Sequence, residues 1–281
     1  MNFRHSKNLY PPSDSIAKVC GIAWSQNNMR LAIANSERKI VIFDENGTKK
    51  DSFSTKPAGA NKNYMIRDIL FSPDSTKLAI AQSDKIIFVY KLGSSWGDKK
   101  TICNKFEQSS SISCMVWSRN KPNELFAGLT EGKIKLCLLN KNTSSVLYSH
   151  DHPCISLSSS QDGKFIISGH SDNVILKYNL ENSNVQKLCI HTCEPICLGW
   201  GASGSILAAG NDGRVTFYND IGKKLQHFDY NKDDKLKEFT CCKISPSGDA
   251  IAVGNFNQFF VYLYNARKQN WEFCNKKVDN Y

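Results

Sequence analysis

The sequence predicts an all-β fold, a β-propeller, from three observations. First, a sequence repeat of three apolar segments occurs six times along the 281 residues, at intervals of 40 to 47 residues. Second, each segment is short enough for a strand and too short for a helix. Third, Pro, Asp, Asn and Gly gather between the segments, where tight turns need them. Repeats of this length typically build four-stranded sheets arranged around an axis.

The first segment of each repeat is an inner strand that ends on or near a bulky apolar residue. Successive bulky residues are separated by 47, 46, 40, 43 and 44 positions. A period near 44 residues is typical of WD40-type blades, which have about 40–45 residues each. The six bulky residues are Trp24, Phe71, Trp117, Leu157, Trp200 and Ile244.

The second segment consists of small and aliphatic residues and carries no charge. We therefore expect it to be buried on both faces, between neighbouring blades, where small residues let adjacent sheets approach. The expected second strands are residues 31–34, 78–81, 125–128, 165–169, 206–210 and 250–254.

The third segment alternates apolar and polar residues, so we expect a half-buried strand. The expected third strands are residues 39–44, 85–90, 132–136, 174–178, 213–218 and 259–262. Three of the turns that precede them suit hairpins with positive φ, namely Glu131-Gly132, Asp172-Asn173 and Asp212-Gly213.

A fourth, outer strand is more polar, with candidates at residues 51–54, 101–106, 145–149, 185–190, 224–228 and 270–273. Residues 2–9 also read as an outer strand with no repeat before them. The sequence therefore predicts one WD40 propeller over residues 1–281, the N-terminal domain or a fragment of a longer protein. It is either an incomplete seven-bladed ring or a six-bladed ring that the N-terminal strand closes.

The composition, 41% hydrophobic and 22% charged, is that of an ordinary soluble globular protein. No apolar run approaches the ~20 residues of a membrane span, and the N-terminus has no signal-peptide core. We therefore expect the eleven cysteines to be buried thiols in a reducing cytoplasm. The net charge of +10 favours acidic partners, although the basic residues are scattered in pairs.

No catalytic constellation is recognisable. Cys189, Cys193 and Cys197 are evenly spaced, but no second pair completes a zinc motif, and residues 150–154 read as a polar turn between blades. Asp74 and Asp162 stand in turns and are expected to form those turns. The sequence therefore predicts no enzyme, no cofactor and no metal.

Partner-binding residues are expected on the long connections, because loops on a rigid scaffold carry most binding sites. The links at residues 54–68 and 229–238 would emerge on one face, where they place Lys56, Lys62, Arg67, Lys232, Lys235 and Lys237. The loop at residues 93–100 would lie on the opposite face and offers Trp96, Lys99 and Lys100, with the tryptophan as a typical interface anchor.

Four stretches are more specific than the repeat itself. They are residues 17–28, the run Phe-Ser-Thr-Lys-Pro-Ala at 53–58, the run Phe-Ser-Pro-Asp-Ser-Thr-Lys-Leu-Ala-Ile at 71–80, and residues 96–106. Together they resemble the N-terminal propeller of the intraflagellar transport protein 172 family, the largest subunit of the B complex. The match runs from residue 1 to about residue 273, at lower density in the fourth and fifth repeats.

The resemblance implies a scaffold in the trains that move along ciliary microtubules, with a role in turnaround at the ciliary tip. It implies other B-complex subunits as partners, including the one with a calponin-homology domain, and a location in the cilium or flagellum, basal body and cytoplasm. These 281 residues do not include the family's second propeller and helical solenoid. Asp84, Asp172 and Asp212 keep the turn acid of WD40 blades, but the histidine partner is missing from most repeats.

Two other classes of function remain open. A basic propeller could bind nucleic acid or an anionic membrane surface, in which case affinity would fall steeply with salt. A propeller enzyme would need acids or metal ligands at the channel mouth, where Asp and Glu are sparse. If a seventh blade is missing, the exposed flanks would cause self-association, and roughly 45 following residues, one further repeat, would cure it.

Overall fold

The computed structural model describes residues 7–9, 17–59, 63–231, 238–256 and 258–274. These residues form six antiparallel sheets, each made of four consecutive strands, with no strand pairing between sheets. The chain divides into two compact units, one with the described residues up to Asp151 and one with those from His152 onward.

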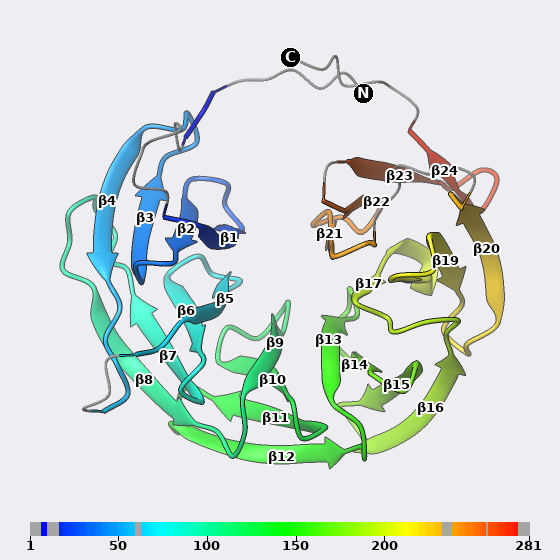
Figure 1. Ribbon diagram of the computed structural model, residues 1–281, viewed down its shortest axis with the longest axis horizontal. Coiled ribbons are helices and arrows are strands. Elements are labelled where there is room, and N and C mark those ends of the chain that lie inside the picture. The colour runs from blue at the N-terminus through cyan, green and yellow to red at the C-terminus, as the bar shows by residue number, and fades with distance from the viewer. Residues whose placement is uncertain (1–6, 10–16, 60–62, 232–237, 257, 275–281) are drawn as a thin grey trace. The chain divides into compact units, whose positions relative to one another are not determined.

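The first unit contains three sheets, coloured from blue to green in Figure 1. The first is β1 (Val19–Trp24), β2 (Leu31–Asn35), β3 (Lys39–Phe43) and β4 (Lys49–Ser54). The second is β5 (Ile66–Phe71), β6 (Lys77–Gln82), β7 (Ile86–Lys91) and β8 (Thr101–Glu107). The third is β9 (Ile112–Trp117), β10 (Glu124–Leu129), β11 (Lys133–Leu138) and β12 (Thr143–Ser149).

The second unit repeats this arrangement. Its first sheet is β13 (Cys154–Ser159), β14 (Phe165–His170), β15 (Val174–Asn179) and β16 (Asn184–Ile190). The second is β17 (Cys197–Trp200), β18 (Ile206–Ala209), β19 (Arg214–Tyr218) and β20 (Lys224–Asp229). The third is β21 (Cys241–Ile244), β22 (Ala250–Gly254), β23 (Phe259–Asn265) and β24 (Asn270–Phe273).

The all-β fold and all six outer strands are confirmed. β24 has the predicted bounds, and β4 begins two residues before its predicted start. Positive φ at Gly132, Asn173 and Gly213 confirms the three predicted hairpin turns. The expected closing strand at residues 2–9 falls mostly outside the described residues, and Lys7, Asn8 and Leu9 are not in a strand. The number of blades in a closed ring therefore stays a prediction.

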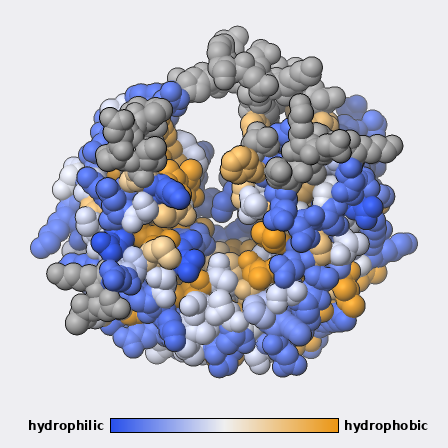
Figure 2. Space-filling model, viewed as in Figure 1, coloured by the Kyte–Doolittle hydropathy of each residue, from blue (hydrophilic) through white to orange (hydrophobic). Residues whose placement is uncertain are grey.

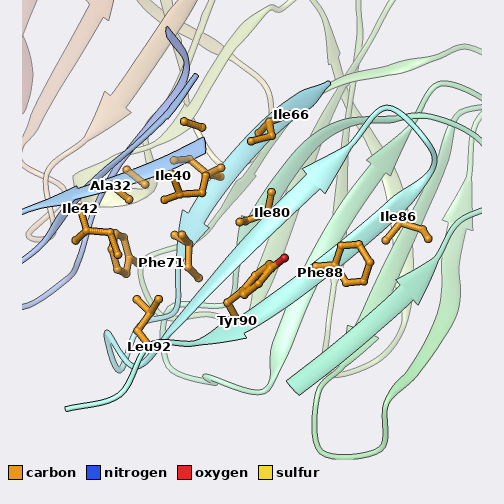
Figure 3. Close-up of a cluster of buried hydrophobic side chains, with 14 residues drawn as sticks. Ala32, Ile40, Ile42, Ile66, Phe71, Ile80, Ile86, Phe88, Tyr90 and Leu92 are labelled. Atoms are coloured by element: carbon orange, nitrogen blue, oxygen red, sulfur yellow. The ribbon is translucent and has the colours of Figure 1, made fainter. Parts of the chain in front are cut away.

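The second strands are buried on both faces, as predicted, in the first five sheets. β2 and β18 are buried at every position. The core between the first two sheets combines residues of β2 and β3 with residues of β5 to β7; Figure 3 shows Ile40 and Ile42 facing Phe71 and Ile80. β22 differs, because only alternate residues are buried there, and Ala250, Ala252 and Gly254 on its other face are partly exposed.

The half-buried third strand is confirmed for β11 and β23, whereas β3, β7, β15 and β19 are more buried than their alternating pattern predicts. β15 is the clearest case, since Lys177 keeps only 8% of its surface exposed. Its ammonium group donates a hydrogen bond to the carbonyl of Asp220 at 2.9 Å and lies 4.5 Å from the ring centroid of Phe165. The expectation of a half-buried strand was wrong here because sheets cover both faces and the lysine satisfies its charge inside them.

All eleven cysteines are free thiols. Four are buried, namely Cys137, Cys154, Cys193 and Cys197, whereas Cys103 and Cys241 are exposed, which corrects the expectation that the cysteines are buried. The one helical segment among the described residues is the three-residue turn η1 (Ala202–Gly204), so no described helix is long enough to cross a membrane.

Candidate interaction surfaces

The first candidate surface is the link between β4 and β5, which hydrogen bonds hold at both ends. The Thr55 N–H donates to the carbonyl of Arg38 at 3.0 Å, and the Thr55 hydroxyl lies 2.8 Å from that of Tyr64. The Arg38 guanidinium lies 5.3 Å from the centroid of the Tyr64 ring. Thr55 and Tyr64 are both buried, so the link is fixed to the sheets at both ends.

The middle of this link presents basic side chains. The Gln82 side chain donates to the Lys56 carbonyl at 3.1 Å, and the Ala58 N–H donates to Asp84 at 3.1 Å. The Lys56 backbone is therefore held in place while its side chain is exposed. Arg67 and Lys85 are also exposed at this end of the second sheet. We call Lys56, Arg67 and Lys85 the basic end of the first unit.

The other predicted cations of this surface are Lys62, Lys232, Lys235 and Lys237, and all four lie outside the described residues. The structure therefore places Lys56 and Arg67 together and leaves the predicted ring of cations a prediction. Lys85 was missed by sequence reasoning because it stands in a short turn between β6 and β7, and only long connections were considered.

The second candidate surface is the loop between β7 and β8, which carries Trp96. The Arg30 guanidinium comes from the β1–β2 turn, donates to the carbonyls of Gly93 and Ser94 at 3.1 and 3.2 Å, and lies 5.0 Å from the Trp96 ring centroid. Trp96 keeps 40% of its surface exposed. Arg30 and Trp96 thus form a platform of a cation stacked on an aromatic ring.

The loop is preorganised by its own residues. Gly93 has φ of 68°, and a Cβ there would lie 2.5 Å from atoms of Asp98, so this position requires glycine. Lys100 forms an ion pair with Asp51 of β4 and donates to the carbonyl of Asp98 at 2.6 Å. Partial burial acts to raise the pKa of Asp51, but the hydrogen bond and charge of Lys100 outweigh it and lower that pKa.

The predicted binding residues of this loop therefore differ in availability. Trp96 and Lys99 are exposed, whereas the Lys100 side chain is only 8% exposed and is engaged by Asp51. Arg30 was missed because nothing in its sequence neighbourhood links it to a loop more than 60 residues away. On the face in Figure 2 hydrophilic residues predominate, with hydrophobic residues between them, which suits surfaces that bind through a few anchors.

The described residues that resemble catalytic groups have structural roles. The Ser168 hydroxyl lies 2.8 Å from Nε2 of His170, the distance of a nucleophile and its base. Both residues are fully buried, however, and Nδ1 of His170 lies 3.0 Å from the His152 carbonyl. A substrate has no access to such a pair, so we assign it to strand packing.

The turn acids are likewise engaged by their own turns. Asp74 accepts hydrogen bonds from the hydroxyl of Ser72 and from the N–H and hydroxyl of Thr76. Partial burial acts to raise the pKa of Asp74, but the bonds from Ser72 and Thr76 prevail and lower it to about 2. Asp162 accepts in the same way from Ser160. The prediction that these acids form turns is confirmed.

Six consecutive four-stranded antiparallel sheets with short turns and anchored links define an all-β propeller of the WD40 class. A family model for the WD domain, G-beta repeat, matches residues 141–179, which cover β12 of the third sheet and β13, β14 and β15 of the fourth.

Curated relatives identify the region more closely. Intraflagellar transport protein 172 of Chlamydomonas reinhardtii is 42% identical over 293 residues, which cover 100% of this chain and 17% of that protein. The Homo sapiens homolog is 41% identical over 281 residues, covering 97% and 16%. Intraflagellar transport protein osm-1 of Caenorhabditis elegans is 34% identical over 275 residues, covering 97% and 16%. The chain is a relative of the WD40 region of intraflagellar transport protein 172, and it spans about a sixth of the length of these proteins.

Proposed function

We propose that this chain is a non-catalytic scaffold that binds other proteins within an intraflagellar transport complex. The observation that carries the proposal is similarity along the whole chain to proteins named for intraflagellar transport. The fold supports it, because stacked sheets with exposed loops offer wide surfaces for partners.

The partners that fit this role are other subunits of the B complex, including the subunit with a calponin-homology domain. The corresponding location is the cilium or flagellum, with the basal body and cytoplasm as sites of assembly. The +10 net charge supports acidic surfaces on those partners, since opposite charges steer association.

Two surfaces of the first unit are proposed as contact sites. The Trp96 loop offers an exposed aromatic ring stacked with Arg30 and the neighbouring Lys99, which is the composition of an interface anchor. The basic end, Lys56, Arg67 and Lys85, offers cations on a fixed backbone. We also propose four further lysines for the basic surface, on the ground of their charge alone: Lys62, Lys232, Lys235 and Lys237.

The experiment is to express the tagged chain in ciliated cells and identify the proteins that co-purify with it. We expect B-complex subunits and a ciliary signal. Trp96→Ala should weaken their capture by about 30-fold if the ring is an anchor worth about 2 kcal/mol. Ile221→Ser is the matched control, because Ile221 is 72% exposed in a turn of the second unit. Recovery of no transport subunit would contradict the scaffold proposal.

A specific observation supports a second candidate, binding to nucleic acid or an anionic membrane. Lys56, Arg67 and Lys85 are exposed together at the basic end. Lys56→Glu combined with Arg67→Glu would then abolish binding to anionic vesicles or RNA, and wild-type affinity would fall steeply between low and physiological salt. Binding to partner subunits that tolerates salt, with none to vesicles or RNA, would reject this candidate.

A further inference from the structure

Three different side chains of metal-ligating types converge in the second unit. His191 and Cys193 belong to the link between β16 and β17, and Asp212 belongs to the turn between β18 and β19. One ring nitrogen, the thiol sulfur and a carboxylate oxygen lie within 4.8 Å of one another. Ligand atoms on one tetrahedral zinc ion stand about 3.3–3.8 Å apart, given bonds of about 2.0–2.3 Å. Each pair of ligand atoms therefore needs to approach by about 1.5 Å at most to hold such an ion.

A buried ring nitrogen of His191 supports a metal ligand at this position independently of the clustering. The residue is 2% exposed, and its Nδ1 lies 2.8 Å from the hydroxyl of Tyr218. Its Nε2 is buried and has no hydrogen-bond partner. A buried ring nitrogen without a partner costs free energy, so the side chain is incomplete as it stands. When Nδ1–H donates to the tyrosine oxygen, Nε2 keeps its lone pair, which is the tautomer of a metal-bound histidine oriented by an outer partner.

The backbone around the group is shaped for close approach. A Cβ at Gly210 would lie 2.1 Å from the carbonyl oxygen of Glu194 and 2.8 Å from the sulfur of Cys193. Glycine at this position therefore lets the His191–Cys193 link lie against the end of β18. Asp212 accepts hydrogen bonds from the N–H of Arg214 at 3.1 Å and from the hydroxyl of Thr192, and these bonds orient its carboxylate.

We propose that this cluster is a metal site in which His191 Nε2, Cys193 Sγ and an Asp212 carboxylate oxygen bind one zinc-like divalent ion. Imidazole and thiolate ligands favour Zn²⁺ and Co²⁺ over the hard cations Mg²⁺ and Ca²⁺. Binding of the metal ion releases the Cys193 thiol proton to solvent and changes no oxidation state, so it needs no oxidant or reductant. Three protein ligands leave a fourth position for water or for a side chain of a partner.

The test uses the full chain freed of metal and then titrated with Co²⁺ and with Zn²⁺. We expect one equivalent of Co²⁺ to produce a sulfur-to-cobalt charge-transfer band, and one equivalent of Zn²⁺ to remove it. Zn²⁺ should also raise the melting temperature. No stoichiometric binding, or a cobalt spectrum without sulfur ligation, would overturn the proposal and leave His191 Nε2 as a hydrogen-bond partner of Asp212 after a small side-chain shift.

Variants separate the site from general thiol chemistry. Cys193→Ser should remove the charge-transfer band, and Asp212→Asn should weaken Zn²⁺ binding by at least about tenfold. Asp84→Asn changes the corresponding turn acid of the second sheet, and Cys114→Ser changes a thiol in the first unit, so both should bind as the wild type does. Circular dichroism of each variant without metal checks the fold. If Cys193→Ser disturbs the fold, Cys193→Asp replaces it, because aspartate removes the sulfur but keeps a ligand at this position. Unchanged binding by Cys193→Ser would also overturn the proposal.

Discussion

At the scale of single residues, serine side chains close the turns that precede four of the six second strands. Ser72 accepts a hydrogen bond from the Lys77 N–H at 3.0 Å and donates to Asp74. Ser25, Ser160 and Ser245 occupy the same position in other repeats, and each accepts from a backbone N–H five residues later. The recurring Ser therefore has a structural role, because its hydroxyl accepts a hydrogen bond from a backbone N–H that the turn would otherwise leave without a partner.

Asp74 makes the turn that Ser72 closes sensitive to acid. Its lowered pKa means that the ionised form stabilises the fold fully above the unfolded value near 3.9 and loses this effect as the pH falls toward about 2. Asp74→Asn should lower the free energy of unfolding by about 1 kcal/mol at neutral pH. The two proteins should converge as the pH falls through this window, in urea unfolding followed by tryptophan fluorescence. An equal effect of Asp151→Asn, which changes an exposed acid, would contradict this account.

Lys177 shows how a charged residue is accommodated in a core. Its ammonium group lies between the carbonyl of Asp220 and the stacked rings of Phe165 and Trp200. Lys177→Ala should cost about 2 kcal/mol, because it removes both the stem packing and a charged hydrogen bond. Lys177→Met should cost less, since it keeps the stem. Urea unfolding measures both, and equal costs would show that the stem contributes nothing.

At the scale of elements, one glutamine joins the last two sheets of the second unit. The Gln226 side chain of β20 donates to the carbonyl of Trp271 at 2.8 Å and accepts from its N–H at 3.0 Å. Trp271 of β24 stacks on Phe217 with ring centroids 5.0 Å apart, and its indole N–H donates to Ser205 at 2.9 Å. The Gln226 side-chain amide thus makes two hydrogen bonds to the backbone of another sheet, as a neighbouring strand would within one sheet.

Removing that amide should loosen β24. Gln226→Leu leaves a partly buried N–H and carbonyl of Trp271 without partners, so we expect a loss of about 2 kcal/mol. The measurement is the free energy of urea unfolding, with amide hydrogen exchange of β24 as a local check. Gln186→Leu is the matched control, because Gln186 is exposed on outer strand β16. A loss as large in the control would show that the effect is not due to this contact.

At the scale of the whole molecule, each unit exposes apolar residues on a sheet. In the first unit, Ile22 and Trp24 of β1 are 55% and 48% exposed and pair with Ile33 and Leu31 of β2. In the second unit, Phe259 of β23 is 50% exposed, and β22 is buried only at alternate positions. Contiguous apolar sheet faces of this kind favour association.

We therefore expect the 281-residue chain to self-associate through these faces. Replacing Ile22, Trp24 and Phe259 by serine should shift the species toward monomer in light scattering after size exclusion. Ile221→Ser, which removes an exposed apolar residue from a turn, should leave the distribution unchanged. A wild-type chain that is monodisperse and monomeric at high concentration would contradict this expectation.

Sequence reasoning could predict most of the fold, because strands, turns and repeat spacing depend on residues close together in the chain. The outer strands and the positive φ of Gly132 and Gly213 are local features of this kind. Of the candidate sites, it could place Trp96 on an exposed loop and Lys56 on a link. It could not find Arg30 beside Trp96, because that contact joins separate sheets.

The sequence by itself determined the class of the protein, since a repeat of about 44 residues allows few architectures. Only the tertiary structure decided which polar residues are available for binding. It buried Lys177 and paired Lys100 with Asp51, and it brought His191 and Cys193, from a link between two sheets, next to Asp212 in a turn within one of them. The physical reason is that burial and long-range pairing depend on how sheets pack, and no local pattern records the neighbour that a side chain will meet.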